Sequence, residues 1–117
     1  MGWPERQGIA CAAGDVSAPA ANVAAVVNYA AVAGERHVIT GVAYSYSAAP
    51  TGGNLKIEDV SGTVVFSMDL SAAGAGVVLF PEPKKSAAPG TALVITLAAG
   101  GASCTGKVSV LNHWTEG

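Results

Sequence analysis

Charged side chains are scarce in this chain of 117 residues: Asp, Glu, Lys and Arg together make up 12% of it, and the net charge is −2. A nucleic-acid site needs clustered Lys and Arg, which the six scattered basic residues do not provide. Half of the residues are hydrophobic, so a highly charged, disordered chain is excluded as well. Aromatic residues amount to only 6%, so we expect a core of small, branched side chains.

Long apolar runs are also lacking. No stretch of about 18 apolar residues is present, so we expect no membrane-spanning helix. The N-terminal residues MGWPER contain neither a basic segment nor a leucine-rich one, so we expect no secretory signal and synthesis in a cytoplasm. Cysteines usually stay reduced there. We therefore predict that Cys11 and Cys104 are free thiols, with a disulfide between them as the alternative.

Motifs that carry catalysis or bind metals are missing too. The two cysteines, His37 and His113 do not have the spacing of a four-ligand zinc site. Glu58 and Asp59 are adjacent, so a strand would point them to opposite faces, and we expect both to be solvated. No G-x-S-x-G elbow, P-loop or dinucleotide fingerprint is present. We expect no enzyme activity, no cofactor and no metal.

Period-2 alternation of apolar and polar residues is the main positive signal. Leu55 and Ile57 alternate with polar residues, and a second run follows after a Ser-Gly pair, with apolar positions at Val64, Phe66, Met68 and Leu70. Two such runs joined by a short turn predict an antiparallel hairpin with one face in water. We expect the core to include Leu55, Ile57, Phe66 and Ile95.

Two strands are expected before this hairpin. Residues 22–32 are ambiguous, because their alanine and valine spacing also suits a helix, but four valines and a tyrosine favour a strand. Residues 37–47 should form the next strand. Simple alternation there separates Ile39 from a face made of Val38, Val42, Tyr44 and Tyr46.

Three more strands are expected after the hairpin. Residues 77–80 form a short apolar strand, and 91–97 and 104–114 form two longer ones, the last with Val108 and Val110 inward. Between the first two, residues 81–90 contain three prolines. Because proline removes a ladder donor, we expect an exposed loop there.

These elements predict one all-β domain, an antiparallel β-sandwich of about seven to eight strands over residues 22–117. The cysteines and tryptophans do not follow the Cys…Trp…Cys order of immunoglobulin domains, so we favour a jelly-roll-like sandwich.

Residues 1–21 show no periodicity and are rich in Gly, Ala and Pro, which indicates an extended N-terminal arm. Trp3 is the one large side chain there, and Pro4 keeps the chain extended next to it. Trp3 either folds back onto its own domain or docks on a neighbouring subunit. We favour the intermolecular arm, and take Trp3 and Pro4 as candidate contact residues.

Three further residues are candidates for contacts with a partner. Lys84 and Lys85 lie within the proline-rich expected loop, where they can meet an acidic surface. Trp114 lies near the end of the last strand and offers an aromatic ring, either for a protein partner or for the apolar face of a sugar.

Three segments resemble small virion proteins of tailed bacteriophages: 37–57, 81–84 and 105–111. Over about residues 22–115 the chain is similar to capsid decoration, or cement, proteins in its general residue pattern and in short loop sequences. The resemblance implies a structural protein of the capsid exterior that binds the major capsid protein, with a homotrimer favoured. These proteins share no single invariant motif, so the resemblance implies a role for this chain but assigns no site residues.

Two other hypotheses about the function stay open. A phage adhesin or carbohydrate-binding sandwich would present exposed aromatic and polar groups around a concave site. A tail or head-completion component is the third.

Overall fold

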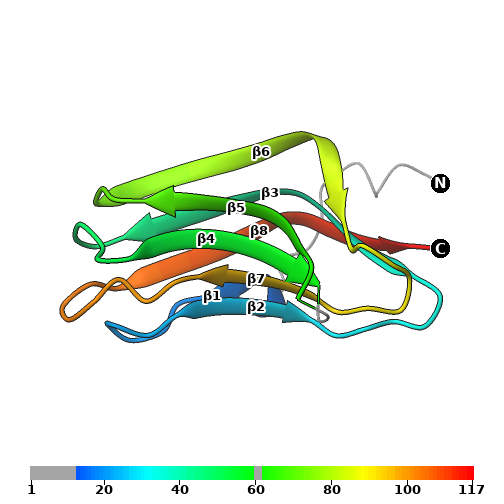
Figure 1. The fold of residues 1–117 in the computed structure, drawn as a ribbon, viewed down its shortest axis with the longest axis horizontal. Helices are drawn as coiled ribbons and strands as arrows, with labels where there is room; N and C mark the ends of the chain where they lie inside the picture. Colours follow the sequence, from blue (N-terminus) through cyan, green and yellow to red (C-terminus); the bar gives the residue numbers. More distant parts are fainter. Residues whose placement is uncertain (1–12, 60–61) are drawn as a thin grey trace.

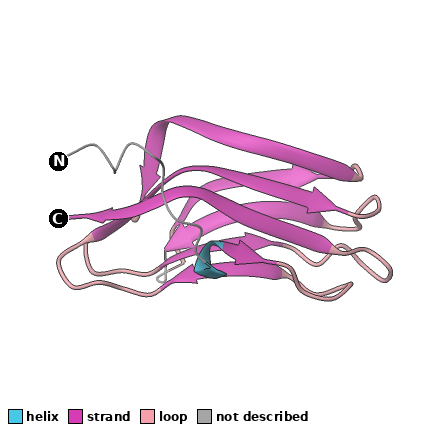
Figure 2. Ribbon diagram, turned by 180° about the vertical axis from the view of Figure 1, so that it is seen from behind, coloured by secondary structure: helices cyan, strands magenta, loops and turns pink. Residues whose placement is uncertain are grey.

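Two antiparallel sheets of four strands make up the fold, and the predicted all-β sandwich is confirmed (Figure 1). The computed structural model describes residues 13–59 and 62–117. Within these residues there is no α-helix, and the one helical element is a single 3-10 turn, η2 (Ala13–Asp15) (Figure 2). The strands are β1 (Val16–Ser17), β2 (Ala25–Tyr29), β3 (Arg36–Tyr46), β4 (Gly53–Asp59), β5 (Val64–Leu70), β6 (Gly74–Lys85), β7 (Leu93–Leu97) and β8 (Gly106–Glu116).

The strand order is β1-β8-β3-β6 in one sheet, called sheet A here, and β2-β7-β4-β5 in the other, sheet B. Residues 22–32 thus contain a strand and no helix, as favoured from the valines, although the strand is shorter than that segment. No helix among the described residues is long and apolar enough to cross a membrane.

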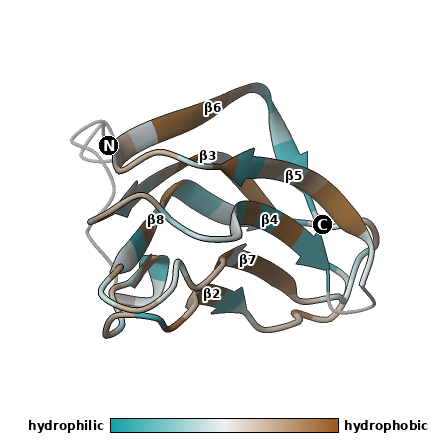
Figure 3. Cartoon of the chain, turned by 60° about the vertical axis from the view of Figure 1, so that its left-hand side comes forward, coloured by the Kyte–Doolittle hydropathy of each residue, from teal (hydrophilic) through white to brown (hydrophobic). Residues whose placement is uncertain are grey.

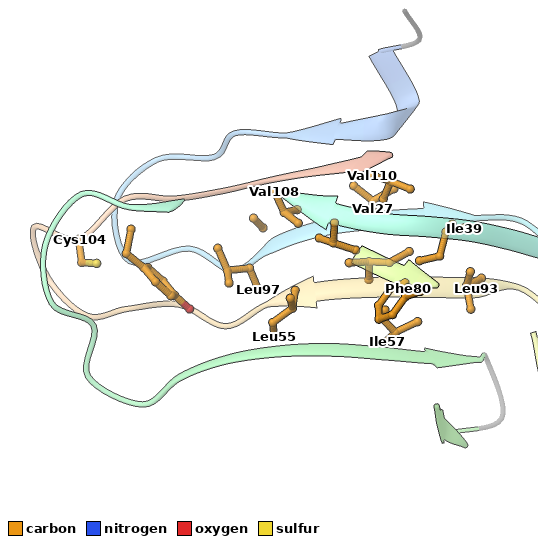
Figure 4. Packing of buried hydrophobic residues seen from close by; sticks show 14 residues of the cluster. Val27, Ile39, Leu55, Ile57, Phe80, Leu93, Leu97, Cys104, Val108 and Val110 are labelled. Atoms are coloured by element: carbon orange, nitrogen blue, oxygen red, sulfur yellow. The ribbon is translucent and has the colours of Figure 1, made fainter. Parts of the chain in front are cut away.

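The core lies between the sheets and consists mainly of Val, Leu and Ile (Figure 4). The predicted core residues Leu55, Ile57 and Ile95 are all fully buried there. Phe66 is only half-buried, and its ring packs edge-on against Phe80 with the ring centroids 5.2 Å apart. The prediction is therefore confirmed for the three aliphatic residues, while Phe66 lies at the margin of the core.

The predicted hairpin is β4–β5, with Leu55 opposite Met68 and Ile57 opposite Phe66. The register shifts after Ile57, and Glu58 pairs with Val64. This irregularity reverses the alternation at the start of β5, so that Val65 packs against the core and Val64 is exposed. The prediction that Val64 faces inward is wrong for this reason.

Asp59, which was expected to be solvated, is buried with 3% of its surface exposed. It ends β4, and its carboxylate accepts a hydrogen bond from the backbone N–H of Thr63. A buried carboxylate needs such donors, and here the turn between the two strands supplies one. The Asp59 side chain therefore holds the turn together.

Strand β6 extends into the first half of the expected loop, 81–90, since it continues to Lys85 and includes Pro81 and Pro83, while residues 86–90 form no strand. The strand tolerates the two prolines because it is the edge strand of sheet A, where a missing N–H breaks no ladder bond on the open side. The pairing with β3 is also irregular there, because Gly41 pairs with Leu79 but Ile39 pairs with Lys84. Edge prolines and lysines also discourage further strand pairing.

Strands β3 and β8 change the face that their side chains present partway along their length. Ile39 lies in the core with Val42, whereas Val38 lines a hollow on the outer face of sheet A. The predicted grouping of Val38 with Val42 is therefore wrong, because alternation is interrupted between Ile39 and Val42. In β8 the interruption coincides with Asn112, whose φ is +52°.

Part of the segment assigned to the N-terminal arm belongs to the sandwich. Val16 and Ser17 pair with Ser109 and Val108 of β8. The Ser17 hydroxyl also accepts a hydrogen bond from the Val26 backbone N–H, which links the two sheets. Residues 1–12, including Trp3, Pro4 and Cys11, lie outside the described residues. Cys104 is buried as a free thiol, as predicted.

Candidate functional site

Two of the five candidate contact residues meet at one end of sheet A. Trp114 on β8 and Lys85 on β6 both pair with Val38 of the intervening strand β3, so the three side chains form a row across the sheet. Lys84 is not part of this row, because its ammonium lies 5.8 Å from the ring centroid of Phe80. Trp3 and Pro4 lie outside the described residues.

A hollow of about 300 Å³ surrounds this row on the outer face of the sheet. Its lining consists of Val38, Glu82, Pro83, Lys85, Trp114 and Glu116. Trp114, one of the two tryptophans in the chain, has 39% of its surface exposed. We call this feature the Trp114 hollow.

The charged groups of the Trp114 hollow are arranged around Glu116. The Lys85 ammonium donates a 2.6 Å hydrogen bond to its carboxylate. This bond lowers the pKa of Glu116, with smaller contributions from the indole N–H of Trp114 and the positive charge of Arg36. Arg36 lies opposite Glu116 in the β3–β8 register, and its Nε is buried with no hydrogen-bond partner among residues 13–59 and 62–117.

A second cluster of polar side chains lies between the sheets, on the other side of the same strands. His37 Nδ1 and His113 Nε2 are 2.9 Å apart, and His37 Nε2 lies 2.6 Å from the carbonyl oxygen of Ala30. The Tyr29 ring stacks on His113 with the centroids 3.7 Å apart, and its hydroxyl donates to Asp15. We call these four side chains, Asp15, Tyr29, His37 and His113, the histidine cluster.

The hydrogen bonds of the histidine cluster restrict its protons. A carbonyl oxygen only accepts, so His37 Nε2 must carry a proton. One proton is then left for the His37–His113 contact when both rings are neutral. Burial, followed by the charge of His37, lowers the pKa of His113, against an opposing effect of Asp15. Burial and the bond to Asp15 raise the pKa of Tyr29.

The outer face of sheet A also carries an apolar strip, formed by Val77, Leu79 and Leu111. Val77 and Leu79 are 60% and 67% exposed on β6, which Figure 3 colours as hydrophobic over its middle part. A Cβ on Gly41 would lie within about 3 Å of Leu79 Cδ2 and 3.3 Å from Leu111 Cδ1, so these two side chains close over that glycine. Beside the strip lies a shallower hollow of about 270 Å³ that includes Lys107.

Sequence reasoning identified Trp114 and Lys85 but missed the rest of both sites. Nothing local in the sequence pairs His37 with His113, because 76 positions separate them. In the part of the chain that the structure describes, no three His, Cys, Asp or Glu side chains are grouped as a metal site.

No protein-family model matches this chain, and no curated protein matches it either. The arrangement of the side chains therefore carries the functional argument.

Proposed function

We propose that this chain is a structural virion protein that decorates the exterior of a phage capsid by binding the major capsid protein. The observation that supports this most is the apolar strip on sheet A. Val77 and Leu79 project from an edge strand into solvent. Their partners on β3, Ala43 and Gly41, are also uncharged, so the apolar surface continues onto the next strand. Contiguous exposed apolar residues of this kind are typical of surfaces that other proteins cover.

The connectivity of the strands is consistent with this role, and we propose that the sandwich is a jelly roll. Consecutive strands change sheet at every step except β4 to β5, which gives the orders β1-β8-β3-β6 and β2-β7-β4-β5. Eight strands in two Greek keys form the jelly rolls of viral capsid and lectin domains. This is an analogy of fold, and fold alone does not assign function.

The sparse charge supports an assembled state. With 12% charged residues, an isolated subunit has little polar surface with which to surround itself. Burial of the apolar strip against the major capsid protein, or within a homotrimer on the capsid, removes that exposure.

Co-sedimentation of the full chain with undecorated capsids of the phage that encodes it tests the proposal. Replacing both apolar residues, Val77→Glu and Leu79→Glu, should abolish attachment because two carboxylates would be buried at the contact. The matched control is Val26→Glu with Val64→Glu, at two exposed valines of sheet B, which should attach normally. Equal attachment of both double variants, or no attachment of the unmodified chain, would contradict the proposal.

A further inference from the structure

The Trp114 hollow combines an exposed aromatic side chain with hydrogen-bonding groups of both kinds. Trp114 supplies an aromatic surface, Glu82 and Glu116 supply acceptors, and Lys85 supplies a donor. Pro83 adds exposed apolar surface, and the buried Val38 lies beneath the hollow. Its volume of about 300 Å³ is at the small end of ligand sites, enough for one six-membered ring with its substituents.

This mixture fits a ligand with one apolar face and a polar rim. A pyranose ring has such a form, because its axial C–H groups make one face apolar while its hydroxyls project around the edge. The C–H face stacks on an indole, which is large and polarisable. The hydroxyls donate to carboxylates and accept from an ammonium, and each such bond is strengthened by the charge.

The same groups disfavour other ligands of this size. A phosphate or a nucleotide carries negative charge, which the carboxylate of Glu82 repels, while the ammonium of Lys85 is already paired with the carboxylate of Glu116. A wholly apolar ligand would cover the Glu82 carboxylate without offering it a hydrogen bond, which is unfavourable. A neutral, hydroxyl-rich ring avoids both penalties.

Part of the site is held in place before any ligand arrives. Lys85 Nζ binds Glu116 Oε2 at 2.6 Å, and the pairing of both Trp114 and Lys85 with Val38 fixes their spacing across three strands. Groups that are already positioned lose less freedom when a ligand binds. Glu82 forms no ion pair with any described residue, so its carboxylate remains available to a ligand.

We propose that the Trp114 hollow binds one pyranose unit of a carbohydrate, with Trp114 as the stacking surface and Glu82, Glu116 and Lys85 as hydrogen-bonding groups. The proposal does not depend on attachment to a capsid. A protein that decorates a capsid and holds this site would present it either to a surface polysaccharide or to a free sugar.

The test uses the full chain carrying Trp3→Phe, so that Trp114 is the sole tryptophan. The probes are the methyl glycosides of glucose, galactose, mannose and N-acetylglucosamine, each titrated to about 100 mM. At least one should change the Trp114 emission saturably, and saturation-transfer NMR should show the ring C–H protons of that glycoside in contact with the protein. Comparing that glycoside with a polysaccharide containing it distinguishes a free sugar from a polymer as the natural source.

Variants then locate the binding by the same NMR measurement. Trp114→Ala should weaken binding by about tenfold or more, and Trp114→Phe by less, because a smaller ring still stacks. Glu82→Gln should weaken binding moderately, since an amide oxygen accepts a weaker bond than a carboxylate. Lys107→Ala, in the separate hollow of about 270 Å³ towards the other end of sheet A, is the control and should bind as the unmodified chain does.

Three results would overturn the inference. The first is the absence of a saturable response to every glycoside. The second is binding that Trp114→Ala leaves unchanged while circular dichroism shows a folded protein. The third is a change in Trp114 emission on adding capsids but not glycosides, which would make the hollow a protein contact.

Discussion

Acidification should destabilise this protein through its histidine cluster. His37 Nε2 keeps its proton for the carbonyl of Ala30, so one more proton on this pair makes one ring cationic, and a second would set two N–H donors against each other. The contact of 2.9 Å between the rings therefore survives one added proton but not two. Beyond the first proton, the folded state resists protonation that the unfolded chain accepts freely.

The sign and size of the effect follow from proton linkage. The pKa of His113 is lowered in the folded state, mainly by burial and then by His37. Between its usual value of about 6.5 and the lowered one, the unfolded chain binds more protons, so the free energy of unfolding falls as the pH falls. The slope is at most about 1.4 kcal/mol per pH unit for one proton. Above pH ~6.5 this contribution is fully present.

Urea unfolding at several pH values between about 7.5 and 5 measures this slope. His113→Gln is the informative variant, since its amide can still donate to His37 Nδ1 but does not titrate. The variant should show a flatter dependence of the unfolding free energy on pH over that interval. Exposed carboxylates such as Glu116 titrate at lower pH and affect both proteins alike. Identical slopes for the two proteins would refute the reasoning.

Four other outcomes are expected. Stability should fall above pH ~10, because the raised pKa values of Tyr29 and Tyr46 mean that the unfolded chain loses these protons first; Tyr29→Phe should make that alkaline decline shallower in a thermal melt, and an unchanged decline would contradict the role of Tyr29. Ile57→Ala should cost about 2–5 kcal/mol in urea unfolding and more than Phe66→Ala, and the reverse order would contradict the burial. Cys104 should resist a thiol reagent until the chain unfolds, when both cysteines should react. Deleting residues 1–12 should weaken assembly and leave the melting temperature nearly unchanged; a lowered melting temperature with normal assembly would argue against an intermolecular arm.

The all-β class and the hairpin were predictable because their signals are local. Leu55 and Ile57 alternate with polar residues over a single strand, and burial follows that alternation directly. The prediction failed one strand later at Val64, where the register shift after Ile57 reverses the facing of the side chains. A bulge leaves no clear mark in a sequence, because it depends on how two strands pair.

The extent of β6 was not predictable for a different reason. Pro81 and Pro83 are incompatible with a central strand but not with an edge strand. Whether a strand lies at an edge depends on the order of all strands in the sheet, and no local sequence pattern predicts that order. The exposure of Val77 and Leu79 was not predictable for the same reason, because a short apolar run in a sequence indicates a buried strand.

The histidine cluster and the Trp114 hollow both depend on one local backbone feature that sequence reasoning did not anticipate. Plain alternation from Val108 and Val110 would turn Trp114 inward and His113 outward. The positive φ of Asn112, a conformation that asparagine tolerates better than most residues, accompanies the opposite arrangement. Ile39 still pairs with His113 and Gly41 with Leu111, so the ladder continues on both sides of the change. The same turn of the chain thus places a proton-sharing ring between the sheets and an aromatic ring on the surface, and restoring plain alternation would remove both sites together.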